Sequence, residues 1–196
     1  MDGDQLLYVI ASAAKAERRL RGPVVGTVMS NFGLELALRA QGIDFIRVPV
    51  GDRYVLAKLK ECDGVLGGET SGHILSLDRT TTGDGLITAL QVLGIMKQTG
   101  RPLAELAAGM EKLPQVLLNV KVARRFDPMS VPEIVQTVHR VEKQLHGEGR
   151  VVLRASGTEP KIRVMVEGRD DSEVHACAEE LAEVVRQTSA PGQASA

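Results

Sequence analysis

Two arginines flank a short loop of hydroxyls and a glycine in the last quarter of the chain. The stretch reads Arg154-Ala155-Ser156-Gly157-Thr158-Glu159-Pro160-Lys161-Ile162-Arg163. Guanidinium groups offer forked donors that match phosphate oxygens, and hydroxyl and glycine N–H groups supply further donors. The pattern therefore favours a phosphate-binding loop, whose candidate ligands are Arg154, Ser156, Gly157, Thr158 and Arg163. A hairpin turn with solvated arginines is the alternative.

A second group of polar residues follows the apolar pair Val65-Leu66. It reads Gly67-Gly68-Glu69-Thr70-Ser71-Gly72-His73, and it falls at the carboxyl end of an expected strand, where open α/β sheets place their ligands. Glu69 and Ser71 offer an acceptor and a donor suited to sugar hydroxyls, and histidine titrates near neutral pH. The alternative is a tight loop between a helix and a strand, with a surface glutamate and a hydrogen-bonded histidine.

Two further motifs are weaker. In Gly51-Asp52-Arg53-Tyr54, Arg53 either faces an anion or pairs with Asp52, and the pattern favours the pair. Asp2-Gly3-Asp4 resembles a metal-binding loop, but two carboxylates without a third oxygen ligand make a poor Mg²⁺ site. We expect Asp4 to cap a helix instead, and we expect no metal site in this chain.

The composition narrows the class of protein. The chain has 196 residues and a formal net charge of −1, which gives no support for nucleic-acid binding. Its two cysteines, Cys62 and Cys177, match no metal or redox spacing, so a reducing, cytoplasmic setting is expected. No apolar run has the length of a membrane span, and no membrane partner is expected.

The elements that position these motifs divide into two groups. In the first, an apolar stripe from Leu6 to Ala14 predicts a helix, and helices and strands then alternate up to a helix over 103–110. This alternation predicts a three-layer α/β/α domain with a mainly parallel sheet, over residues 1–114. In the second, strands at 116–122, 151–153 and 162–166 and two helices, the last capped by Ser172, predict a small α+β domain of order β-α-β-β-α. It covers 115–188, and 189–196 form a frayed tail.

Both principal motifs, taken together, resemble the α-D-phosphohexomutase superfamily. They are Gly68-Glu69-Thr70-Ser71-Gly72-His73 and the loop that begins at Arg154, and they occur in the order found there. Val50-Gly51-Asp52-Arg53-Tyr54-Val55 and Asp84-Gly85-Leu86 narrow the resemblance to the bacterial branch that interconverts glucosamine 6-phosphate and glucosamine 1-phosphate. Such enzymes have four domains: the first carries a phosphoserine, the second a Mg²⁺ loop, the third reads the sugar and the fourth holds the phosphate.

The resemblance implies roles for particular residues. Glu69, Ser71, Asp52 and Arg53 would bind the sugar, His73 would transfer a proton or contact the sugar, and the loop after Arg154 would hold the phosphate that does not react. Neither the phosphoserine motif nor the metal loop of the superfamily occurs in this sequence. The chain thus resembles the third and fourth domains alone. Because it lacks the nucleophile and the Mg²⁺ loop, the resemblance implies that it is inactive by itself. The partners that the resemblance implies are a phosphorylated amino-hexose and the missing N-terminal domains. The alternatives are a stand-alone phosphosugar-binding module and a structural domain that binds no ligand.

Overall fold

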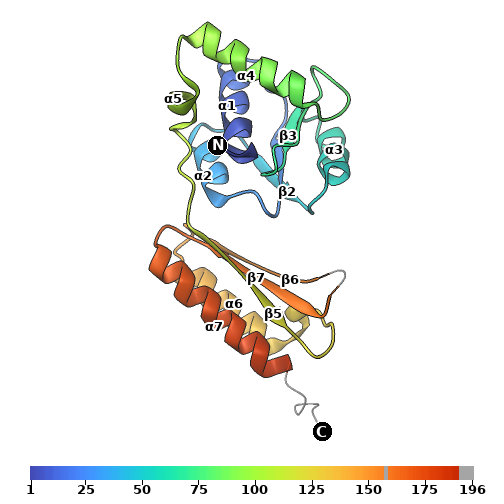
Figure 1. Ribbon diagram of the computed structural model, residues 1–196, viewed down its shortest axis with the longest axis vertical. Helices are drawn as coiled ribbons and strands as arrows, with labels where there is room; N and C mark the ends of the chain where they lie inside the picture. Colours follow the sequence, from blue (N-terminus) through green and yellow to red (C-terminus); the bar gives the residue numbers. More distant parts are fainter. Residues whose placement is uncertain (157–158, 190–196) are drawn as a thin grey trace. The chain divides into compact units, whose positions relative to one another are not determined.

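The chain divides into two compact units, Met1–Lys112 and a second unit that begins at Leu113 (Figure 1). The computed structural model describes residues 1–156 and 159–189. Each unit has a hydrophobic core of its own. The boundary expected near Pro114 lies beside this division, and it stays a prediction together with the roles assigned to its two sides.

A mixed four-stranded sheet forms the centre of the first unit. Its strands are β1 (Val24–Thr27), β2 (Phe45–Val48), β3 (Leu66–Gly68) and β4 (Ile74–Ser76), in the order β2-β1-β3-β4. Strand β1 runs parallel to β2 and β3, whereas β4 is antiparallel to β3. The mainly parallel sheet is confirmed, but β4 was not expected, because three residues are too few to produce a recognisable alternation.

Helices cover both faces of this sheet, which confirms the three-layer architecture. The helices are α1 (Gly3–Ala16), α2 (Phe32–Ala40), α3 (Asp52–Glu61), α4 (Gly85–Thr99) and α5 (Leu103–Ala107). Helices α1 and α2 share one core with α4 and α5, and α3 packs in a separate core that contains Val25, Val48 and Leu75. Within the described part of the chain, no helix is long and apolar enough to cross a bilayer.

The start of α1 differs from the prediction. Asp2, not Asp4, is the N-cap: its carboxylate accepts a hydrogen bond from the Gln5 N–H at 3.2 Å, and the Gln5 side chain accepts one from the Asp2 N–H. This reciprocal arrangement is a capping box, and Lys112 strengthens it with an ion pair to Asp2 at 2.7 Å. Asp4 therefore lies inside the first turn of α1 and does not cap the helix.

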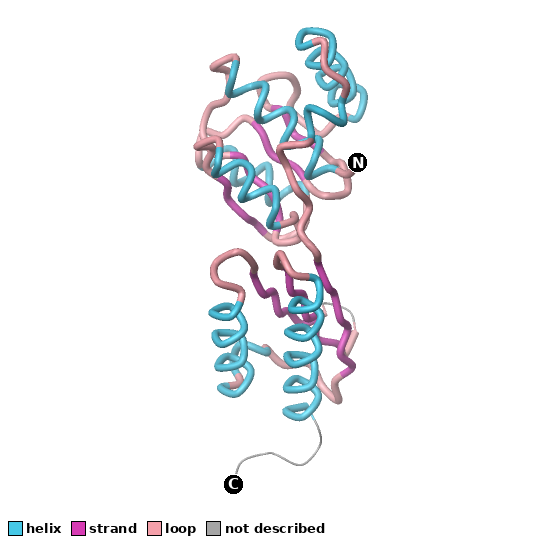
Figure 2. Tube along the Cα trace, turned by 90° about the vertical axis from the view of Figure 1, so that its left-hand side faces the viewer, coloured by secondary structure: helices cyan, strands magenta, loops and turns pink. Residues whose placement is uncertain are grey.

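The second unit is a three-stranded antiparallel sheet with two helices. Its elements are β5 (Gln115–Lys121), the short 3₁₀ helix η1 (Pro128–Ser130), α6 (Pro132–Gln144), β6 (Arg150–Ala155), β7 (Lys161–Glu167) and α7 (Asp171–Ser189). The strand order is β5-β7-β6. Figure 2 shows α6 and α7 side by side on one face of the sheet, and they bury a common core there. The order β-α-β-β-α is confirmed.

Both ends of α7 correct the sequence interpretation. The helix begins at Asp171, and the Asp170 carboxylate accepts a hydrogen bond from the Glu173 N–H at 2.8 Å, so Asp170 and not Ser172 caps it. Ser189 is the last residue of the helix rather than the first of a frayed tail. The rest of that expected tail, 190–196, lies outside the described residues.

Candidate functional site

The motif after β3 is the turn of a β-hairpin, which we call the 69–73 hairpin. The Glu69 N–H donates to the His73 carbonyl at 3.0 Å, and the Gly72 N–H donates to the Glu69 carbonyl at 2.9 Å. Gly72 has a φ of 96°, a region that favours glycine. The turn is therefore fixed at the carboxyl end of β3, as expected, but it joins two strands rather than a helix and a strand.

The first turn of α1 clamps this hairpin from one side. The Gly3 N–H donates to the Thr70 carbonyl at 3.0 Å, and the Thr70 hydroxyl donates to the Asp4 carboxylate at 2.9 Å. A Cβ on Gly3 would lie 2.1 Å from the Glu69 carbonyl oxygen, so only glycine permits this approach. The conformation of the 69–73 hairpin thus depends on residues about 66 positions away in the sequence.

Asp4 is the buried centre of this contact. Its side chain is fully buried, and besides Thr70 it accepts a hydrogen bond from the Asn31 N–H at 2.9 Å. Burial raises the pKa of the Asp4 carboxyl, and the hydrogen bonds from Asn31 and Thr70 oppose that shift. Asp4 therefore joins three segments: the first turn of α1, the start of α2 and the hairpin.

Glu69 links the hairpin to the turn before α3. Its Oε1 accepts a hydrogen bond from the Gly51 N–H at 2.9 Å, and Gly51 has a φ of 131°, where a side chain would be strained. Glu69 is half-buried and Ser71 is exposed. One carboxylate oxygen of Glu69 thus fixes a neighbouring loop, while Ser71 presents its hydroxyl to solvent.

His73 faces Asp52, which brings two of the sequence-predicted motifs together. The distance from His73 Nε2 to Asp52 Oδ2 is 3.7 Å, an ion pair whenever the imidazole is protonated. Gly83 packs against the ring, since a Cβ there would lie 2.3 Å from Nε2. The Arg53 guanidinium lies 4.6 Å from the centroid of the Tyr54 ring and donates to the Tyr54 hydroxyl. One carboxylate oxygen of Asp52 is therefore directed to His73, and the other accepts a hydrogen bond from the Arg53 N–H at 2.7 Å. The Arg53 guanidinium contacts Tyr54 instead of forming the expected ion pair with Asp52.

In the second unit, the two arginines of the opening motif are cross-strand neighbours. Arg154 on β6 pairs in register with Arg163 on β7, and Asn119 on β5 pairs with Arg163 from the other side. Side chains alternate along a strand, and Ile162 and Val164 belong to the core under the helices, so both arginines lie on the opposite face. Like charges directly opposite each other destabilise a sheet. An anion bound between them would remove that repulsion.

The loop between β6 and β7 is held at its described ends. Ser156 is buried, its N–H donates to the Lys161 carbonyl at 2.8 Å, and its hydroxyl accepts from the Glu159 N–H at 3.3 Å. Lys161 pairs with Glu159 at 2.8 Å, and this contact lowers the pKa of the Glu159 carboxyl. The predicted ligands Gly157 and Thr158 lie outside the described residues.

More cations lie at this end of the sheet than the sequence interpretation identified. Lys121 pairs in register with Lys161, and the exposed residues Arg124 and Arg125 follow at the end of β5. The Val122 N–H donates to the Pro160 carbonyl at 3.0 Å, which places this segment beside the loop. Arg124 and Arg125 stand shortly after the strand expected at 116–122, and that position is the sequence signal by which they could have been identified.

The described side chains do not offer a divalent-cation site. In that part of the chain, no cluster of at least three His, Cys, Asp or Glu residues could hold a metal. Asp2 caps α1 and pairs with Lys112, and Asp4 is buried against Thr70 and Asn31. Hard cations such as Mg²⁺ require several accessible oxygen ligands, and these two carboxylates already have other partners.

Two domain models of one known protein family match almost the whole chain. The family model described as phosphoglucomutase/phosphomannomutase, alpha/beta/alpha domain III, matches residues 2–113, and the model of the C-terminal domain of the same family matches 117–184. Phosphoglucosamine mutase of Halorhodospira halophila is 55% identical over 195 residues, and that of Marinobacter nauticus is 52% identical over 188. These matches cover 100% and 96% of the chain, but only 43% and 42% of the relatives.

A solved structure has the same fold. It is N-acetylphosphoglucosamine mutase of Aspergillus fumigatus in complex with GlcNAc-6P and magnesium, with a TM-score of 0.77 and 23% sequence identity. The match covers 94% of this chain and 47% of that one. The chain therefore spans less than half the length of the proteins it is similar to.

Proposed function

Because the chain belongs to the phosphoglucomutase/phosphomannomutase family, we propose that it is the substrate-binding C-terminal part of a phosphoglucosamine mutase. Such an enzyme interconverts glucosamine 6-phosphate and glucosamine 1-phosphate through a phosphoserine and a bisphosphate intermediate. The identity of more than 50% with curated phosphoglucosamine mutases over almost the whole chain supports this substrate class. In this proposal, glucosamine 1-phosphate is the precursor for the synthesis of UDP-N-acetylglucosamine and of the cell wall. We infer that the reaction takes place in the cytoplasm.

The phosphate ligands that we propose are Arg154, Ser156, Gly157, Thr158 and Arg163. The observation that carries this proposal is the in-register pair of Arg154 and Arg163 on the face of the sheet away from the helices. A phosphate held there would accept charge-assisted hydrogen bonds from both guanidinium groups. It would also neutralise two like charges that otherwise repel each other. Lys121 adds to the same positive field.

The sugar-reading residues that we propose lie in the first unit. Ser71 and the second carboxylate oxygen of Glu69 would donate to and accept from sugar hydroxyls, because Oε1 of Glu69 is already used by Gly51. His73 would accept a proton from a sugar hydroxyl or return one to it. Asp52, whose Oδ2 lies 3.7 Å from His73 Nε2, would orient the imidazole. Arg53 would contact the substrate only if its guanidinium moved away from the Tyr54 ring, so we propose a minor role for Arg53 in substrate binding.

Phosphoryl transfer itself would require residues that this sequence lacks. Catalysis of this reaction is mainly positioning and charge stabilisation around a nucleophile and a metal ion. Mg²⁺ would supply that charge stabilisation in the intact enzyme, but the donor set described above does not fit it, so we place both metal and phosphoserine in the remaining part of the enzyme. By itself, the chain should bind a phosphosugar without converting it. A coupled assay across Mg²⁺ concentrations tests this, and reproducible conversion would contradict it.

An NMR titration tests the binding function directly. Glucosamine 6-phosphate added to ¹⁵N-labelled protein should shift amide signals in the 69–73 hairpin and near Arg154 and Arg163. Glucosamine without phosphate is the matched control, and it should leave the signals of Arg154 and Arg163 in place. A titration that moves neither segment would contradict the proposal, and would leave a structural domain without ligand as the better reading.

A further inference from the structure

Helix α4 is apolar on the side that the fold leaves uncovered. Its inner side buries Thr88, Val92 and Ile95. Its outer side carries three leucines, and the sequence from Gly85 to Met96 contains no charged residue. A helix that is apolar all round is typical of a position with neighbours on both sides, yet among the described residues of the first unit α4 has packing neighbours on its inner side only.

The outer leucines form one continuous stripe, which we call the α4 stripe: Leu86, Leu90 and Leu93. Their exposed fractions are 79%, 68% and 57%. The spacing of four and then three residues puts them on the same face of the helix. Single exposed leucines on a surface are ordinary, but a contiguous apolar row marks an interaction surface.

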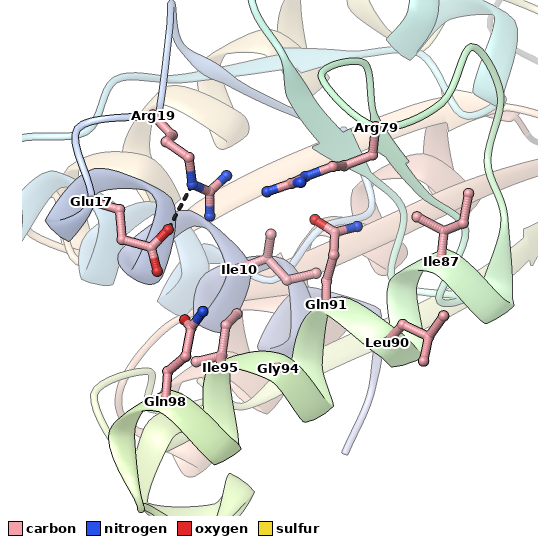
Figure 3. Close-up of a pocket in the computed structure, with 10 residues that line it drawn as sticks. All are labelled: Ile10, Glu17, Arg19, Arg79, Ile87, Leu90, Gln91, Gly94, Ile95 and Gln98. Atoms are coloured by element: carbon pink, nitrogen blue, oxygen red, sulfur yellow. Dashed lines mark hydrogen bonds and ion pairs between the residues drawn. The ribbon is translucent and has the colours of Figure 1, made fainter.

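A pocket of about 350 Å³ lies beside the α4 stripe (Figure 3). Ile87 and Leu90 give it an apolar wall, and the side chains of Arg19 and Arg79 point into it from opposite sides. Arg19 is held by Glu17 at 2.6 Å, and both arginines lie within 3.4 Å of the Asp78 carboxylate. An apolar row with fixed donors at its border has the composition of a protein–protein interface, with an apolar centre and a polar rim.

We propose that the α4 stripe and this pocket are the docking surface for the part of the same enzyme that precedes domain III. This inference rests on the proposed function. The curated relatives carry more than half of their length outside the matched segment, and the family model that matches the first unit describes a third domain. A neighbouring domain in one chain therefore exists in those relatives, and an apolar segment with acceptor groups would fit this surface.

The area of the surface favours a covalently linked neighbour over a second copy. The α4 stripe extends from Leu86 to Leu93, about 12 Å of helix, and at roughly 10 Å wide it offers roughly 120 Å². Stable association of separate proteins needs roughly 800 Å² on each partner. A linked domain is present at a high effective concentration, so a smaller contact suffices to hold it in place.

Cysteine labelling tests the docking surface. The leading segment of the Halorhodospira halophila relative would be joined ahead of Asp2, with Cys62→Ser removing the half-buried native thiol. Leu90→Cys should react with a maleimide rapidly in the 196-residue chain, and more than about tenfold more slowly in the joined protein, since a covered thiol reacts only after local opening. Lys60→Cys, exposed on α3, is the control and should react equally in both.

The outcomes separate this inference from the proposed function. Equal labelling of Leu90→Cys in both proteins overturns the docking surface, even if the joined protein converts substrate. A protected cysteine without conversion supports the surface and contradicts only the function. Protection in the 196-residue chain together with a dimer in sedimentation assigns the surface to a second copy and overturns the proposal.

A second measurement does not depend on the joined protein. Leu90→Gln with Leu93→Gln in the 196-residue chain should change the midpoint of thermal unfolding by no more than about 2 °C, because both side chains are mostly exposed there and glutamine has nearly the same helix propensity as leucine. A large fall in that midpoint would mean that the leucines stabilise the first unit itself, and it would overturn the docking role.

Discussion

The Thr70 hydroxyl donates a 2.9 Å hydrogen bond to the Asp4 carboxylate, and through it the 69–73 hairpin is attached to the first turn of α1. Asp4 is fully buried and also accepts from the Asn31 N–H. The side chains that we propose to read the sugar therefore depend on a carboxylate that has no access to solvent. Substituting Asp4 by alanine removes both its hydrogen bonds and its charge, whereas substituting it by asparagine removes the charge alone.

Asp4→Ala should lower the free energy of unfolding by about 2–3 kcal/mol, because the Thr70 hydroxyl and the Asn31 N–H would both lose a buried acceptor. Asp4→Asn is the matched control, since its amide oxygen can accept both hydrogen bonds. Urea unfolding of the three proteins measures the difference. Equal stability of Asp4→Ala and the unsubstituted chain would show that this contact does not hold the hairpin.

The same residue gives the protein a defined pH dependence. Burial raises the pKa of Asp4 above its ordinary value of 3.8, so between these two values the folded state keeps a proton that the unfolded state has released. The contribution of Asp4 to the free energy of unfolding is thus complete below about 3.8 and is lost as the pH rises through the folded pKa. We expect the unsubstituted chain to lose stability relative to Asp4→Asn, which does not titrate there, as the pH is raised toward neutrality. A difference that is constant with pH would contradict the raised pKa.

Glu69→Gln should weaken glucosamine 6-phosphate binding while leaving the binding of inorganic phosphate unchanged. The amide can still accept from the Gly51 N–H through its oxygen, but it replaces the other carboxylate oxygen with a donor. Loss of one charged acceptor of a hydroxyl corresponds to roughly 1.5–3 kcal/mol. Parallel calorimetric titrations with the two ligands measure this selectivity. Equal weakening for both would assign Glu69 a structural part only.

Most of the architecture could be predicted from local patterns, and the exceptions have identifiable causes. Asn31 and Asp84 cap α2 and α4, and each stands directly before a run rich in apolar residues, a position that a local window of sequence can show. At α1, Asp2 and Asp4 are both good caps, and the choice depends on tertiary partners: Lys112 for Asp2, and Thr70 for Asp4. Such partners are not visible in a local window of sequence.

The candidate site was predictable in its residues but not in its contacts. The sequence pointed to Glu69, His73 and Asp52, yet only the hairpin between β3 and β4 brings His73 to Asp52. The outer leucines of α4 could not be identified as exposed, since periodicity does not tell an inner face of a helix from an outer one when both are apolar. In the second unit, the register of β6 and β7 places Arg154 opposite Arg163.

The central claim is that Arg154 holds the phosphate group of a phosphosugar. Isothermal calorimetry of glucosamine 6-phosphate with the unsubstituted chain and with Arg154→Ala tests it most directly, with Arg186→Ala on α7 as the control for a surface arginine engaged elsewhere. A charge-assisted phosphate contact contributes roughly 1.5–3 kcal/mol, so Arg154→Ala should weaken binding roughly 10- to 100-fold while Arg186→Ala leaves it unchanged. Equal affinities of the unsubstituted chain and Arg154→Ala would contradict the claim.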